Sequence, residues 1–141
     1  MIGIDTNILI ACEVPEHPAF HQVHAFFDRE IDAGIGFAIA PQVIAEFIHA
    51  VTDPKRFAQP LSVLEAVERA EIWQNSLETT IVGVDVRAFE LFFEWMRVHR
   101  LGRKRVLDTM LAATYSAHGI ARIATLNCSD FQVFDAFEFA L

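Results

Sequence analysis

The 141-residue sequence has only two cysteines and no long apolar run. Cys12 and Cys128 lie far apart and outside any CxxC pair with zinc-site spacing, so we expect both to be reduced and structural. No apolar stretch reaches the roughly 18 residues that a membrane-spanning helix needs. Asp5 also interrupts the N-terminal apolar run before it could serve as a signal peptide. The sequence therefore predicts a cytoplasmic protein with no membrane segment.

Positive charge is also scarce in this chain. Eleven Lys and Arg residues stand against nineteen Asp and Glu residues, which gives a formal net charge of −8. This balance argues against diffuse electrostatic binding to nucleic acid, so such a substrate would need metal cations or a local basic patch. The segment "RVHRLGRKR" contains five of the eleven basic residues: Arg97, Arg100, Arg103, Lys104 and Arg105. A charge run of this kind is typical either of a solvated helix end and loop or of a phosphate-binding surface.

The composition and the order of apolar patterns indicate a folded α/β protein. Hydrophobic residues make up 53% and charged residues 21% of the chain, which excludes a disordered protein, and the length fits one domain over residues 1–141. Strands are predicted at residues 1–5, 37–40, 79–84 and 120–125. Helices are predicted at residues 6–13, 18–33, 41–53, 61–77, 85–100 and 106–118. This alternation predicts a three-layer α/β/α fold with a mostly parallel central sheet, because parallel strands require crossovers and both sheet faces must be covered.

Local signals support several of these helices. Thr6 is available to cap the first helix, and Pro41 suits the first turn of the third, where a proline loses no hydrogen bond. The helix at residues 61–77 has one apolar side, formed by Leu61, Leu64, Val67 and Ile72. Aromatic side chains on other helices are expected in the core or in a dimer interface: Phe26, Phe27, Phe89, Phe92, Phe93 and Trp95.

Four acidic residues occupy positions that a parallel sheet brings together. Asp5 ends the first strand, Glu46 lies one turn into the helix after the second strand, and Asp130 follows the fourth strand. Asp108 lies in the first turns of a helix so apolar that we expect it to be buried on most sides. Each acid alone could be a helix cap or a turn residue. Together they predict one cluster, because ligands bind outside the carboxyl ends of the strands in such sheets.

A cluster of carboxylates requires a compensating cation. A carboxylate on an apolar helix is costly unless it is paired, protonated or bound to metal. The dipole of a helix N-terminus contributes only about 1 kcal/mol or less, which is too little to offset full burial. Oxygen-only ligands select hard cations such as Mg2+ or Mn2+, which bind substrate phosphates through one or two carboxylates. The four acids therefore predict a phosphoryl-transfer site.

The motifs around these acids resemble a known family. The sequence has "DTN" at the end of the first strand, a glutamate early in the helix after the second, "VLDTMLAATYSAHG", and "IATLNCSDF" after the last predicted strand. In order and spacing over nearly the whole chain, these motifs resemble a PIN domain and, more closely, a VapC-type toxin ribonuclease of bacterial toxin-antitoxin pairs. The resemblance implies a PIN-like fold, an RNA substrate and an acidic quartet of Asp5, Glu46, Asp108 and Asp130. It also implies Asp5 and Asp108 as direct ligands of Mg2+ or Mn2+.

The resemblance extends to neighbouring polar residues and to partners. It implies that Thr6 and Asn7 orient the first acid, and that Thr125 and Asn127 line the same pocket. Many PIN nucleases carry an aspartate where Asn127 stands, so either Asp130 or Asn127 completes the acidic site. The family also implies a homodimer and a cognate VapB-like antitoxin that covers the groove.

The expected chemistry follows from these charges. A metal held by Asp5 and Asp108 would lower the pKa of a bound water, and Glu46 or Asp130 would orient or deprotonate that water for in-line attack on a phosphodiester. Arg103, Lys104 and Arg105 directly precede Asp108 in the sequence and are expected to hold the flanking phosphates.

Several other functions are alternatives to a metal-dependent ribonuclease. A zinc site could use one helix face formed by His17, His21, His24 and Asp28, although no further Cys or His cluster completes a tetrahedron. A Rossmann nucleotide-binding protein lacks support because "DTNIL" is not a glycine-rich turn, and an aspartyl phosphatase would carry a second Asp where Asn7 stands. A PIN-like RNA-processing nuclease outside a toxin-antitoxin pair and a non-catalytic α/β interaction domain are the remaining alternatives.

Overall fold

Five short strands form one sheet in the order β3–β2–β1–β4–β5. The computed structural model describes residues 1–141, and its strands are β1 (Ile2–Ile4), β2 (Phe37–Ile39), β3 (Thr79–Ile81), β4 (Arg122–Ala124) and β5 (Glu138–Phe139). Every strand pair is parallel, so the sheet is wholly rather than mostly parallel. β1 is the central strand, where Gly3 pairs with Ala38 on one side and Ile123 on the other.

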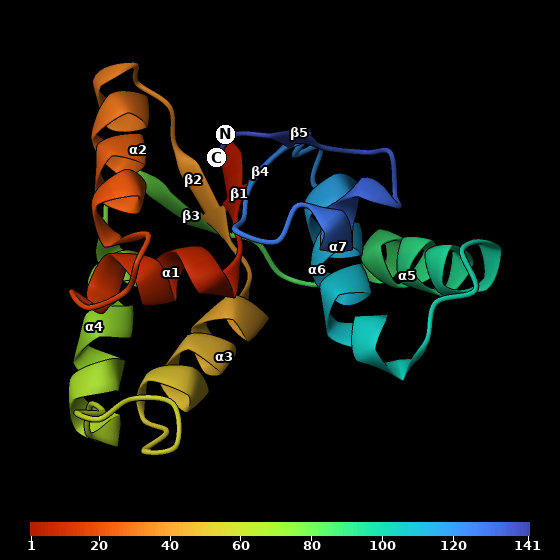
Figure 1. Cartoon of the computed structure of the whole chain (residues 1–141). Coiled ribbons are helices and arrows are strands. Elements are labelled where there is room, and N and C mark those ends of the chain that lie inside the picture. Colours follow the sequence, from red (N-terminus) through yellow and green to blue (C-terminus); the bar gives the residue numbers. More distant parts are fainter.

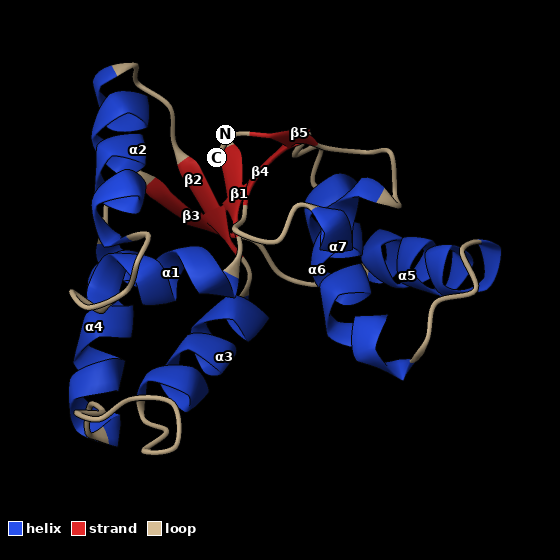
Figure 2. Cartoon of the chain, in the orientation of Figure 1, coloured by secondary structure: helices blue, strands red, loops and turns tan.

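Helices cover both sides of this sheet and confirm the predicted three layers. On one side lie α1 (Thr6–Glu13), α2 (Phe20–Asp32), α3 (Pro41–Val51) and α4 (Val63–Asn75) (Figure 1). On the other lie α5 (Val86–Val98), α6 (Val106–Ala117) and the short α7 (Ser129–Gln132), with a 3-10 turn, η1 (Arg103–Arg105), before α6. Figure 2 shows the strands between these two groups of helices. None of the helices has the length and apolarity needed to cross a membrane.

The N-terminal residues of α1 and α3 show which of the predicted helix-start residues have that role. Pro41 is the first residue of α3, as predicted. The cap of α1, however, is Asp5 rather than Thr6: Asp5 has an extended backbone (φ −84°, ψ 154°), and its side chain accepts a hydrogen bond from the Thr6 N–H. Thr6 is already helical, and its hydroxyl donates to Glu46 instead. The strand-to-helix turn therefore directs both polar side chains toward the same edge of the sheet.

Some apolar residues that were expected to be buried on the helices are exposed in the structure. In α4 the buried residues are Ala66 and Ala70, whereas Leu64 and Ile72 are 69% and 65% exposed. Of the predicted apolar side, Leu61 packs against the core, but Leu64 and Ile72 do not. The small alanines allow α4 to approach its neighbours closely. Phe26 and Phe27 belong to the core, and Trp95 stacks on Phe134 with ring centroids 4.6 Å apart. Two aromatic residues of α5 are exposed instead: Phe89 and Phe93.

Besides the 3-10 turn η1, two elements were absent from the predictions. The strand β5 has only two residues, and it pairs with β4 at Arg122 and Ile123. The helix α7 has only four residues and lies in the segment expected to be a loop. Neither is long enough to produce a periodic pattern. Both cysteines are free, as predicted, and burial raises the pKa of the Cys12 thiol to about 12, which keeps it unreactive.

Tyr115 of α6 ties the two central strands together directly beneath the carboxyl edge. Its buried hydroxyl lies 2.6 Å from the carbonyl of Ile4 and 3.1 Å from that of Ala38, to which it donates. Its ring packs against Gly3, where an added Cβ would lie 2.6 Å from the ring atom Cδ2. Only glycine at position 3 leaves room for the tyrosine ring.

We expect Gly3→Ala to lower the free energy of unfolding by about 1–3 kcal/mol, because the new methyl group must displace the Tyr115 ring from a packed core. Urea unfolding followed by circular dichroism measures the change. Gly83→Ala is the matched control, since a Cβ at Gly83 meets nothing within 4 Å. Equal stability of the two variants would show that the ring moves aside at no cost.

Candidate active site

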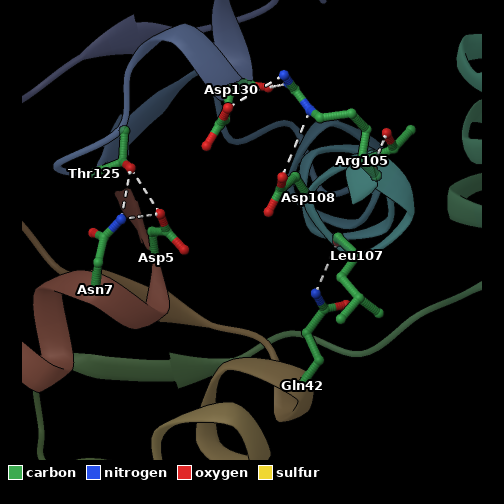
Figure 3. A network of polar contacts seen from close by, with 9 residues as sticks. Asp5, Asn7, Gln42, Arg105, Leu107, Asp108, Thr125 and Asp130 are labelled. Carbon is green, nitrogen blue, oxygen red and sulfur yellow. Dashed lines mark hydrogen bonds and ion pairs between the residues drawn. The ribbon is translucent and has the colours of Figure 1, made fainter. Parts of the chain in front are cut away.

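Asp5 is fixed by three hydrogen bonds at the end of β1. Its Oδ1 accepts from the Thr6 N–H at 2.7 Å, and its Oδ2 accepts from Asn7 Nδ2 and from Thr125 Oγ1, each at 2.7 Å (Figure 3). Asn7 also bonds to the segment that follows β4, because its Oδ1 accepts from the Leu126 N–H at 3.0 Å. Asn7, expected to orient the first acid, and Thr125, expected to line the same pocket, thus both contact Asp5 and hold it in one defined position.

Glu46 is brought to the same edge by α3. This helix starts at Pro41, two residues after β2 ends, and so carries Glu46 toward the end of β1. Thr6 Oγ1 donates to Glu46 Oε2 at 2.8 Å. Thr6 therefore orients Glu46 with its side chain and Asp5 with its backbone.

Asp108 and Asp130 share one counterion, Arg105. Asp108 Oδ2 lies 3.6 Å from Arg105 Nε, and Asp130 Oδ1 lies 3.2 Å from Arg105 Nη1 (Figure 3). The Asp108 side chain is 36% exposed, although most of the α6 residues that follow it are buried, as the apolar pattern of this helix predicted. The buried face of α6 is formed by residues such as Thr109 and Ala112, while Asp108 in the first turn faces the site.

The remaining predicted site residues, Asn127 and the basic residues at 103–105, make different contacts in the structure. Asn127 is exposed and joins the network through its backbone, where its N–H donates to Thr125 Oγ1 at 3.0 Å and its carbonyl accepts from the Asp130 N–H at 2.9 Å. Arg103 and Lys104 are exposed, and their side chains make no hydrogen bond or ion pair. Arg105 differs from them, because its guanidinium is paired with acids rather than free to bind phosphate.

Burial and mutual repulsion disfavour the charged forms of two acids. Loss of hydration raises the pKa of Asp5 from 3.8 to about 6, although hydrogen bonds from Thr125 and Thr6 oppose the shift, and the charges of Asp108 and Glu46 add to it. The pKa of Asp108 is also raised, first by burial and then by the charge of Asp130, while Arg105 acts in the opposite direction. Asp108 therefore lies within electrostatic reach of each of the other three acids, and the negative charge gathered there attracts cations.

The donor set suits a hard divalent cation in its chemistry, because all four side chains offer carboxylate oxygens and none offers nitrogen or sulfur. However, no three His, Cys, Asp or Glu side chains in the structure are placed so that they could hold a metal ion together. Figure 3 shows that Arg105 contacts Asp108 and Asp130 on the side away from Asp5. Mg2+ or Mn2+ would therefore fit the donors after these carboxylates turn toward Asp5.

The zinc alternative gains no support from the structure. Its predicted ligands form no metal-binding group. Instead, His17 Nδ1 accepts from the Ala19 N–H at 3.1 Å, and His24 Nε2 lies 3.0 Å from the Cys12 carbonyl. These histidines therefore act as local structural residues.

Two residues that support the site were not predicted. Tyr115 donates a hydrogen bond to the Ile4 carbonyl at the end of β1. The sequence feature that could have pointed to it is that it is the single tyrosine of the chain and lies within an apolar helix. Gln42 connects α3 to the start of α6, because its Nε2 donates to the Leu107 carbonyl at 3.1 Å. No sequence pattern indicates that contact. A cavity of about 640 Å3 lies elsewhere, beside the end of α1, and none of the four acids lines it.

The fold and the site define an α/β protein with an acidic, oxygen-rich centre at the carboxyl edge of a parallel sheet. A sequence model of the PIN domain matches residues 2–135. The chain belongs to the PIN domain family. A curated relative, Ribonuclease VapC24 of Mycobacterium tuberculosis (strain CDC 1551 / Oshkosh), is 26% identical over 134 residues, which cover 95% of this chain and 91% of the relative.

Solved structures show the same fold at lower sequence identity. VapBC-1 from nontypeable Haemophilus influenzae has a TM-score of 0.70 at 15% identity, and FitAcB from Neisseria gonorrhoeae has 0.69 at 20%; each match covers 99% of this chain and 96% of the other. VapC20 of Mycobacterium tuberculosis, described as a Sarcin-Ricin loop cleaving toxin, has a TM-score of 0.65 at 16% identity and covers 87% of each chain. The PIN-like fold expected from the sequence is thus confirmed.

In the presence of EDTA we expect Asp5→Asn to stabilise the protein at neutral pH. Because the pKa of Asp5 is raised from 3.8 to about 6 on folding, its ionisation costs stability as the pH rises through this interval. The gain from Asp5→Asn should be only about 0.5 kcal/mol at about pH 4 and on the order of 3 kcal/mol at about pH 7.5. Urea unfolding of both proteins at the two pH values measures it.

Asp32→Asn is the control for loss of one negative charge, because Asp32 is exposed and makes no hydrogen bond. Its effect on stability should be small at both pH values. A gain from Asp5→Asn that does not change between the two pH values would contradict the assignment of the burial cost to Asp5.

Proposed function

We propose that the protein is a Mg2+- or Mn2+-dependent endoribonuclease toxin that hydrolyses RNA phosphodiester bonds and is inhibited by a cognate VapB-like antitoxin. The observation that carries the proposal is the meeting of Asp5, Glu46, Asp108 and Asp130 at one edge of the sheet, where the pKa of Asp5 is raised and a cation is favoured. Membership of the PIN domain family and the similarity to a protein named Ribonuclease VapC24 support it.

In this proposal the four acids have different catalytic roles, which we assign from the contacts that hold each side chain. Asp5 and Asp108 would hold the divalent ion, and the hydrogen bonds from Asn7 and Thr125 keep Asp5 in place. When bound, the ion would activate a water molecule and neutralise charge on the reacting phosphate. Glu46, held by Thr6, is placed to orient the attacking water or to accept its proton, and Asp130 is the second candidate for that role.

The exposed basic residues before α6 supply the substrate contact in this proposal. Arg103 and Lys104 lie on η1, directly before the helix that carries Asp108, and neither side chain is used internally. Their charges would hold phosphates that flank the cleaved bond. They would also offset locally the net charge of −8, which otherwise repels RNA.

The antitoxin is proposed from the relatives. VapBC2 from Rickettsia felis was solved bound to a DNA fragment from its promoter, and a further similar structure is a toxin-antitoxin complex from Klebsiella pneumoniae. By analogy, this chain would pair with a small antitoxin, form a homodimer and act in the cytosol. An RNA-processing nuclease outside such a pair would use the same site, so the neighbouring open reading frame decides between these two functions.

Removal of the proposed metal ligands tests the activity. We expect purified protein to cleave RNA in Mn2+ or Mg2+ and to lose activity in excess EDTA. Asp5→Ala and Asp108→Ala should each reduce the cleavage rate by about 100-fold or more, because each removes a direct ligand of the ion. Gel-based cleavage of a labelled RNA measures the rate, and circular dichroism checks that the variants fold.

The melting temperature separates a nuclease from a non-catalytic interaction domain. Mn2+ should raise the melting temperature of the wild type, because a ligand that binds only the folded state stabilises it. The two alanine variants should show little or no such increase. Cleavage that survives in both variants or in EDTA would refute the proposed function.

The basic residues can be tested by the salt dependence of activity. We expect the double variant Arg103→Ala/Lys104→Ala to raise KM and leave kcat nearly unchanged, because these residues bind phosphates away from the reacting bond. The slope of log KM against log salt concentration should fall by about 1, as expected for loss of one or two phosphate contacts. The variant Arg87→Ala removes another exposed cation, on α5, as a control. An unchanged salt slope would show that η1 does not contact RNA.

A further inference from the structure

Arg105 is the only basic side chain that pairs with any of the four acids. Its side chain is 25% exposed, and its guanidinium lies between Asp108 and Asp130, which come from α6 and α7 (Figure 3). Its Nη2 also donates to the backbone carbonyl of Asp130. One residue therefore neutralises two of the four carboxylates and connects two segments of the site.

We propose that Arg105 is a resident counter-cation that competes with the divalent ion, so that metal binding requires Arg105 to release Asp108. This inference rests on the proposed function, because it concerns the same metal site. It assigns to Arg105 a role different from that of Arg103 and Lys104 in the same basic run.

The geometry explains why the acids do not form a ready metal site. Asp108 and Asp130 contact Arg105 on the side away from Asp5, and no three acidic side chains are placed to hold an ion together. A carboxylate oxygen that pairs with the guanidinium is not available to a metal in the same orientation. Arg105 thus engages one carboxylate oxygen of Asp108 and one of Asp130.

The two contacts of Arg105 differ in strength. Its Nη1 and Nη2 reach Asp130, whereas its Nε is buried without a hydrogen-bond partner and lies 3.6 Å from Asp108 Oδ2. Asp108 is therefore attracted by charge but not held by a hydrogen bond. Asp108 and Asp130 are similarly exposed, at 36% and 34%, so it is the missing hydrogen bond that leaves Asp108 the freer of the two to turn toward Asp5 while Arg105 stays on Asp130.

Charge neutralisation determines the direction of the effect. With Arg105 in place, the site already contains one positive charge. That charge repels an incoming cation and offsets part of the repulsion between the carboxylates. Without it, Asp108 and Asp130 face each other uncompensated, so the metal-free protein becomes less stable and the ion is bound more tightly. A residue that served only to link η1 and α7 would affect stability without increasing metal affinity.

The test measures Mn2+ affinity by isothermal titration calorimetry on metal-free protein, with no RNA present. We expect Arg105→Gln to bind Mn2+ about tenfold more tightly than the wild type, since a partly exposed charge at this distance is worth on the order of 1 kcal/mol or more. Arg103→Gln is the matched control, because it removes the same charge from the same turn but from a side chain with no ion pair. It should change the affinity by less than about twofold.

Melting experiments provide a second measurement and a conservative variant. In EDTA, Arg105→Gln should melt at a lower temperature than the wild type, and saturating Mn2+ should remove most of that difference. Arg105→Lys keeps the charge but lacks the fork that reaches both acids, so its Mn2+ affinity should lie between the other two. If Arg105→Gln does not fold in EDTA, Arg105→Lys alone carries the comparison with the wild type.

The outcomes are distinct. Tighter Mn2+ binding by Arg105→Gln and Arg105→Lys, with Arg103→Gln unchanged, supports the inference. If the wild type binds Mn2+ and the Arg105 variants bind it equally or more weakly, the inference is overturned while the proposed metal site stands. If the wild type binds neither Mn2+ nor Mg2+, both the inference and the proposed function are overturned.

Discussion

Repulsion between carboxylates at one edge of a parallel sheet is the constraint on which the site depends. Parallel strands bring Asp5 and the segments that carry Glu46, Asp108 and Asp130 to a common edge. There, loss of water and like charges raise the pKa values of Asp5 and Asp108, so the folded protein holds charge that it would otherwise avoid. Such a cluster is stable only if other groups hold the acids in place and supply positive charge.

Residues beneath the carboxyl edge of the sheet hold the acids in place. Tyr115 fixes the ends of β1 and β2 through one hydroxyl, and Gly3 makes room for its ring. Asn7 and Thr125 then hold Asp5 between β1 and β4. The acid whose charge is most disfavoured by burial is therefore held by hydrogen bonds next to the packed centre of the sheet, and such support keeps a costly charge in a defined position.

Much of this arrangement follows from the sequence, because β1–β4 and α1–α6 are long or periodic enough to show their patterns. Asp5 and Asp130 could be assigned to the edge because they follow strands. The edge strand β5 and the helix α7 could not be predicted, since their few residues are ordered by contacts with distant segments. For the same reason the pairing of Arg105 with Asp130 was not foreseen: it depends on α7 packing near α6. The exposure of Leu64 likewise shows that an apolar pattern does not decide which helix face is buried.

The distribution of charge links metal binding to RNA binding. The chain has a net charge of −8, and Arg105, the one cation inside the acidic cluster, is occupied by two of the acids. RNA phosphates that approach the metal-free site would meet Asp5, Glu46 and the exposed parts of Asp108 and Asp130. A bound divalent ion would offset much of that negative charge and, by competing for Asp108, would loosen the hold on Arg105. Each ligand would thus favour the other, and by thermodynamic reciprocity RNA would raise the affinity for the ion as much as the ion raises the affinity for RNA.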